Sequence, residues 1–227
     1  VYLKVIALDL SLNHLIMIYG DRYNLYHKES TSLLKDRAGI MFANLDNMIK
    51  EFNIDLNSID YLFSTIGPGN FNGIRISLSL IKGLAISNNT KIAGLSSLKL
   101  LSRSYINKDN KNICAIIKAS PGFYYLEVFN KFYNSISAPK LININDKVTF
   151  PISSEEMVLV GTDADLVSKD IKFKGDTFNI SSPKPDSLYF LVKDSIDKNN
   201  YLDASPQYLR EVNASKPSSW KRRPVVK

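Results

Sequence analysis

The sequence predicts an α/β protein made of two similar units in tandem. Three strand patterns, followed by helices and strands in alternation, occur twice along the chain. The 227 residues are 44% hydrophobic, which is enough to bury a sizeable core. We place the first unit at residues 1–108, the second at 109–211 and a basic tail at 212–227.

The first unit opens with short apolar strands and continues with long helical patterns. In the first helix, apolar residues recur at alternating spacings of four and three, and Ser30, Thr31 or Ser32 is available to cap it. The expected elements are strands 3–10, 14–20 and 23–29, helix 31–53, strand 60–66, helix 73–89, strand 91–94 and helix 96–106.

The second unit repeats this order with a weaker pattern and fewer helices. Its expected elements are strands 112–119, 123–130, 132–138 and 157–161 and helices 163–169 and 184–198. Three meandering strands followed by alternating helices and strands is the order of a ribonuclease-H-like unit. Two such units in tandem form the plan of the actin, hexokinase and Hsp70 fold, with the second half degenerate here.

Residues 66–76 hold three glycines and a proline between a strand and a helix. Glycine permits positive φ or close backbone approach, and proline fixes φ. This turn is either a phosphate cradle at a helix N-terminus or a tight turn that packs the helix on the sheet. Neither the Gly-Lys-Ser/Thr ending nor the Gly-x-Gly-x-x-Gly spacing is present, so we favour the tight turn.

The bacterial TsaB (YeaZ) family carries the signature Gly-Pro-Gly-Ser-Phe-Thr-Gly-Leu-Arg, which residues 67–75 resemble. The signature positions that match identically are Gly67, Pro68, Gly69, Phe71, Gly73 and Arg75. Shorter matches to the family follow the same order along the chain, at residues 7–11, 82–85, 94–98 and 206–210. The departures from the family pattern are Leu10, Asn70, Asn72, Ser77 and the segment 118–120, which starts at Lys118.

This resemblance implies a partner subunit that is not itself an enzyme. In that family the chain pairs with a TsaD-like catalytic subunit and acts with a TsaE-like ATPase. Together they transfer a threonylcarbamoyl group to the adenosine next to the anticodon of certain tRNAs. ATP and metal are then expected on the partner subunits, and no cofactor is expected to bind tightly to this chain.

The main alternative is an actin-fold ATPase or small-molecule kinase. The first strand of such enzymes ends in Asp-x-Gly, whereas here Asp9 is followed by Leu10 and Ser11. Asp9 and Ser11 therefore mark a vestigial nucleotide site at most, and a polar strand end that caps a turn is the simpler interpretation. His14 and His27 have no further ligands at metal spacing, so we expect no metal site.

The two long helices of the first unit carry more apolar surface than one sheet face can cover. The helix at 73–89 is apolar nearly all round, and such a helix is buried by something, either its own chain or a partner. We expect these helices to bind the TsaD-like subunit, and to form a homodimer when the chain is alone. The expected partner-binding residues are Leu34, Met41, Phe42, Leu45, Ile49, Ile74, Leu78, Ile81 and Ala85.

The net charge of +7 is concentrated at the C-terminus. Residues 212–227 carry five basic residues and no acid, together with Trp220. A solvated, disordered tail is the simpler interpretation, and contact with tRNA or a pure RNA-binding module are the alternatives. The single Cys114 lies in an apolar strand, no apolar run reaches membrane-spanning length, and we expect a cytoplasmic protein without membrane contact.

Overall fold

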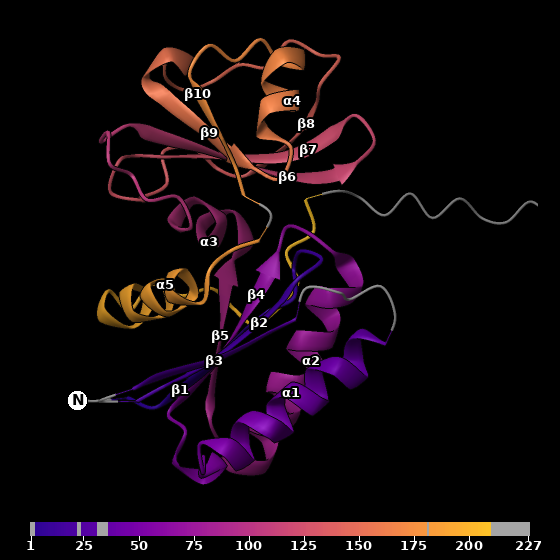
Figure 1. The fold of residues 1–227 in the computed structure, drawn as a ribbon, viewed down its shortest axis with the longest axis vertical. Coiled ribbons are helices and arrows are strands. Elements are labelled where there is room, and N and C mark those ends of the chain that lie inside the picture. Colours follow the sequence, from indigo (N-terminus) through magenta and orange to yellow (C-terminus); the bar gives the residue numbers. More distant parts are fainter. Residues whose placement is uncertain (1–2, 22–23, 31–35, 181, 210–227) are drawn as a thin grey trace, which may run out of the picture.

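The computed structural model describes residues 3–21, 24–30, 36–180 and 182–209 (Figure 1). Two five-stranded sheets form two lobes, and helices α3 and α5 lie between them. The predicted tail at 212–227 and the predicted contact residue Leu34 lie outside the described residues. Of the helices in the described ranges, none combines the length and apolar character that a membrane-spanning segment needs.

Both sheets have the same strand order. The first sheet runs β3-β2-β1-β4-β5, formed by β1 (Val5–Asp9), β2 (Leu15–Gly20), β3 (Leu25–Ser30), β4 (Tyr61–Gly67) and β5 (Lys91–Ser96). The second runs β8-β7-β6-β9-β10, formed by β6 (Asn112–Ser120), β7 (Phe123–Phe129), β8 (Lys140–Asn143), β9 (Met157–Gly161) and β10 (Asp176–Asn179). In each, three antiparallel strands precede two parallel ones, which confirms the predicted pair of ribonuclease-H-like units.

Helices cover both faces of each sheet. The helices are α1 (Arg37–Glu51), α2 (Phe71–Asn88), α3 (Ser97–Arg103), α4 (Ala164–Asp170) and α5 (Pro185–Asp197), with short 3-10 turns at Leu56–Ser58 and Ser154–Glu156. Side chains alternate along β1, so that Ile6 and Leu8 pack under α1 and α2 while Val5 and Ala7 pack under α5. The second sheet is likewise covered by α4 on one face and α3 on the other.

Helix α1 begins later than predicted. It starts at Arg37 with Asp36 as its N-cap, while the predicted start at residue 31 and the predicted caps Thr31 and Ser32 lie outside the described residues. The Asp36 backbone is left-handed at φ 48°, and its Oδ1 accepts a hydrogen bond of 3.0 Å from the Gly39 amide. This carboxylate satisfies one of the free N–H groups of the first turn, which fixes the start of the helix there.

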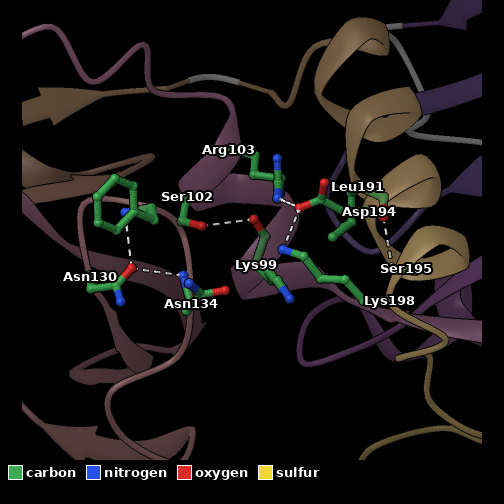
Figure 2. A network of polar contacts seen from close by, with 10 residues as sticks. Lys99, Ser102, Arg103, Asn130, Asn134, Leu191, Asp194, Ser195 and Lys198 are labelled. Atoms are coloured by element: carbon green, nitrogen blue, oxygen red, sulfur yellow. Dashed lines mark hydrogen bonds and ion pairs between the residues drawn. The ribbon is translucent and has the colours of Figure 1, made fainter.

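The second sheet differs from prediction at its two edges. The expected strand at 132–138 is a turn, because Asn130 Oδ1 accepts hydrogen bonds from the amides of Phe132 (2.9 Å) and Asn134 (3.1 Å). Figure 2 shows this turn beside α3. The edge strand is β8 instead. The opposite edge strand, β10, escaped prediction because its four residues, Asp-Thr-Phe-Asn, lack apolar alternation.

Helix α5 packs on the first sheet, although it belongs to the second half of the sequence. Its Leu188, Leu191 and Val192 are buried with residues of β1 and β2. The expectation that helix 184–198 completes the second unit is therefore wrong. Conversely, Leu98 and Leu101 of α3 pack against the second sheet. The division of the chain at residue 108 stays a prediction, because α5 packs on the first sheet and α3 packs on the second.

An ion pair joins the two helices between the lobes. Asp194 on α5 pairs with Arg103 at the end of α3, and Lys198 reaches the same carboxylate at 3.4 Å (Figure 2). The Arg103 side chain is 13% exposed, so the pair is shielded from solvent on one side. Removing the carboxylate would leave a partly buried guanidinium without its partner, which is costly.

Leu188→Ala should lower the free energy of unfolding by about 2–5 kcal/mol, because it opens a cavity between α5 and the first sheet. Hydrogen exchange should accelerate more in β1 and β2 than in β6 and β7. Leu166→Ala, on the exposed face of α4, is the control and should change stability by less than about 0.5 kcal/mol. Faster exchange confined to the second sheet would contradict this packing.

Candidate functional site

The glycine-rich turn at residues 67–73 lies directly against the turn that joins β1 and β2. Gly67 and Gly69 have positive φ, 109° and 155°. A Cβ on Gly69 would lie 2.2 Å from the Ser11 carbonyl oxygen, and one on Gly73 would lie 1.9 Å from that of Leu10. The two backbones are therefore too close for any side chain at these glycines.

Two N–H groups of this turn, those of Asn70 and Gly73, donate hydrogen bonds within the chain. The Asn70 amide donates to the Ser11 carbonyl at 2.5 Å, and the Gly73 amide donates to Asn70 Oδ1 at 2.9 Å. Asn70 is thus the N-cap of α2 as well as the link to the β1–β2 turn. Of the two sequence-based alternatives, the structure has the tight turn that packs a helix on a sheet.

Asp9 ends β1 and is fully buried. Its Oδ1 accepts hydrogen bonds from the Ser11 amide (3.0 Å), the Ser11 hydroxyl (2.6 Å) and the Thr65 hydroxyl (2.6 Å). Its Oδ2 has no partner among the described residues. Burial raises the pKa of the Asp9 carboxyl, and the bonds from Ser11 and Thr65 only partly offset this.

Through these hydrogen bonds, Asp9 connects β1 to the turn that follows it and to β4. The side chains of Asp9 and Ser11, predicted as a vestigial nucleotide site, are indeed together, but both are buried. In the described part of the chain, no three His, Cys, Asp or Glu residues gather as metal ligands do. Burial also raises the pKa of the Cys114 thiol, which packs in the core as predicted.

The C-terminal segment returns to the glycine-rich turn. The Gln207 amide donates to the Ile66 carbonyl at 2.8 Å. The Tyr208 ring lies 5.4 Å from that of Phe71, and the Arg75 guanidinium stacks 4.2 Å above Phe71. Residues that are far apart in the sequence, in the motif 67–75 and in the described part of the motif 206–210, therefore share one exposed aromatic and cationic cluster.

Beside this cluster, an apolar groove of about 470 Å³ runs between α1 and α2. The residues that line the groove are Ala38, Phe42, Arg75, Ile76, Ser79, Leu80, Gly83 and Leu84. Phe42 is 55% exposed at one wall. Gly83 sits in the middle of α2, and a Cβ placed there would meet nothing within 4 Å. Nothing among the described residues explains a glycine at this position.

The structure divides the predicted partner-binding residues into two groups. Those buried under the helices in the core of the first lobe are Met41, Leu45, Ile74, Leu78 and Ile81. Their assignment to a binding surface is corrected, because they pack on the chain's own sheet. Ile49 and Ala85 are partly buried against the same core, and Phe42 alone of the described set lines the groove.

Sequence reasoning missed several groove residues, including Ala38, Ile76, Ser79 and Gly83. A helix that is apolar nearly all round gives no period from which to tell its sheet face from its outer face. The available signal was Gly83, since glycine in a helix interior costs about 1 kcal/mol relative to alanine and calls for a packing reason.

Comparisons with known proteins converge on one family. Residues 38–177 match the family model described as "TsaD: tRNA N6-adenosine threonylcarbamoyltransferase". The chain is 26% identical over 123 residues to the tRNA threonylcarbamoyladenosine biosynthesis protein TsaB of Buchnera aphidicola subsp. Schizaphis graminum, a match that covers 53% of this chain and 58% of that one. The TsaB of Buchnera aphidicola subsp. Baizongia pistaciae is 26% identical over 155 residues, covering 65% and 70%.

The fold is also that of a solved structure from Pseudomonas aeruginosa, described as similar to peptidase YEAZ. The TM-score is 0.81 at 17% identity, over 92% of this chain and 100% of that one. At this identity the likeness concerns the fold alone.

The two helical glycines of α2 should respond in opposite ways to alanine. Gly73→Ala should lower the free energy of unfolding by about 1–3 kcal/mol or more, since the new Cβ collides with the Leu10 carbonyl. Gly83→Ala should raise it by up to about 1 kcal/mol, because it adds helix propensity in open space. Urea unfolding of the isolated chain measures both. Equal effects of the two substitutions would contradict the backbone contact.

Asp9→Asn should keep the fold and raise the free energy of unfolding at neutral pH. Because folding raises the Asp9 pKa, the ionised form is penalised above the folded pKa, and protonation relieves this penalty as the pH falls through it. The amide keeps the bonds to Oδ1 and carries no charge at either pH. The stability difference between variant and parent should therefore shrink from neutral to mildly acidic pH. A difference that grows on acidification would show that the raised pKa is not realised.

Proposed function

Because this chain belongs to the TsaB (YeaZ) family, we propose that it serves in tRNA threonylcarbamoyladenosine biosynthesis as a non-catalytic partner of a TsaD-like catalytic subunit. The matched region covers 58% and 70% of the two curated relatives, so the activity and partners of the whole assembly are part of the proposal. The chain would bind its partner through the groove between α1 and α2.

The groove carries this proposal. It joins an exposed aromatic ring, Phe42, to the exposed face of α2, where Gly83 leaves the helix backbone uncovered. An apolar surface open on one side favours a partner that buries it. A glycine without an internal reason is explained when another backbone approaches closely. A helix of the partner that lies along α2 would bury the apolar surface and would also bring a second backbone close to Gly83.

We propose that the chain is not itself catalytic because its polar groups at Asp9 and in the glycine-rich turn already form hydrogen bonds within the chain. Asp9 is buried and accepts three hydrogen bonds from its own chain, and the Asn70 and Gly73 amides of the glycine-rich turn also donate within the chain. A nucleotide at this place would have to displace these bonds. We therefore propose that ATP and metal bind to the partner subunits, which include a TsaE-like ATPase.

In the absence of the catalytic subunit, the same groove would be covered by a second copy of the chain. A closed pair places the same surface on both sides of a two-fold axis. Self-pairing and partner binding would then exclude each other, because one surface cannot serve both.

Phe42→Glu should leave the chain folded and weaken binding to the TsaD-like subunit at least thirtyfold, about 2 kcal/mol or more, because it buries a charge in the contact. The same buried charge should dissociate the self-dimer, so that the variant sediments as a monomer in sedimentation velocity. The matched control is Phe190→Glu on α5, where the phenylalanine is equally exposed at 55% but lies away from the groove.

Circular dichroism checks that both variants are folded. A folded Phe42→Glu chain that binds the catalytic subunit as tightly as the parent would overturn the docking surface. Equal weakening by Phe190→Glu would place the contact elsewhere. Micromolar ATP binding with turnover abolished by Asp9→Ala would overturn the non-catalytic role and favour the ATPase alternative.

A further inference from the structure

A second cavity, of about 210 Å³, lies between the lobes and is separate from the α1–α2 groove. Its walls come from the end of β5, from α3, from β7 and from α5, and the segment 200–207 closes one side. A water molecule takes about 30 Å³ of liquid, so the space corresponds to a molecule of a few non-hydrogen atoms rather than to a nucleotide.

One wall of this cavity carries a positive charge without an ion-pair partner. Lys99 on α3 is partly buried, and no carboxylate of the described residues lies within 4 Å of its Nζ. Asp194 on the adjacent α5 is engaged by Arg103 and Lys198 (Figure 2). Burial lowers the pKa of the Lys99 ammonium, and the charges of Arg103 and Lys198 lower it further.

The same cavity is also lined by a carboxyl group that is nearly buried. Glu127 on β7 is 6% exposed, and its Oε1 accepts a hydrogen bond of 2.8 Å from the Ser135 hydroxyl. No cation of the described part of the chain pairs with it within 4 Å. Burial raises the pKa of the Glu127 carboxyl, and the Ser135 bond and the Lys99 charge only partly oppose this.

A third polar group in the wall also lacks a partner. Gln207 Oε1 is buried and accepts no hydrogen bond among the described residues. Buried charges and acceptors without partners cost free energy, and the cost is removed when a complementary group binds. A cation and an anion that line one small space, without an ion pair of 4 Å or less between them, complement a molecule that carries both charges.

We propose that this cavity binds a small zwitterion, a molecule with an ammonium and a carboxylate group of the size of a free amino acid. The ligand carboxylate binds Lys99, its ammonium binds Glu127, and Gln207 Oε1 accepts a further hydrogen bond from the ammonium. Binding joins α3, α5 and β7 through one ligand and so stiffens the junction between the two lobes.

The test titrates the full chain with four zwitterions, glycine, L-alanine, β-alanine and γ-aminobutyrate, by calorimetry. Propylamine and propionate, which carry one charge each, are the matched probes. At least one zwitterion should saturate at millimolar concentration, and the single-charge probes should bind about tenfold more weakly or worse, as expected when a hydrogen bond to a charged group is lost. In the amide NMR spectrum, the shifts should be confined to the elements that line the cavity: the end of β5, α3, β7, the second half of α5 and the segment 200–207.

Lys99→Met and Glu127→Gln should each weaken zwitterion binding by about tenfold or more while the chain stays folded. Lys169→Met on α4 and Glu156→Gln change the same charges outside the cavity and should leave binding unchanged. The proposal is overturned if no zwitterion binds. It is equally overturned if the single-charge probes bind as well, or if the Lys99 and Glu127 variants bind like the parent.

Discussion

The contact between the glycine-rich turn and the β1–β2 turn is the constraint on which the first lobe depends. The Asn70 amide donates to the Ser11 carbonyl, while Gly69 and Gly73 allow the two backbones to touch. Asp9 stabilises this contact from inside the core, where its Oδ1 accepts hydrogen bonds from the hydroxyls of Ser11 and Thr65. The direction of α2 is set at its first turn by these few bonds.

Once α2 is fixed, the division of its apolar residues follows. Ile74, Leu78 and Ile81 face the sheet, so Ser79 and Gly83 face outward and form the groove with α1. The same turn also receives the C-terminal segment, through Gln207 and Tyr208. The groove, the aromatic cluster and the cavity between the lobes are thus built around one end of the first sheet.

The sequence predicted the local elements and the fold class well, because strand and helix periods are local properties. The strand at 157–161 was predicted to the residue. Met41 and Leu45 were instead predicted to bind a partner, whereas they are buried under α1 against the chain's own sheet. The packing of α5 on the first sheet could not be predicted in this way, since its apolar stripe fits either sheet. Nor could the positions of Lys99 and Glu127, which have no ion-pair partner among the described residues and which depend on the contact of two lobes.

Hydrogen exchange of the chain with and without the TsaD-like subunit tests the docking claim most directly. Protection on complex formation should appear in α1 and in the outer face of α2, around Phe42, Ser79 and Gly83, while α4 and β8 exchange as before. Protection confined to the second lobe, with α1 and α2 unchanged, would contradict the account.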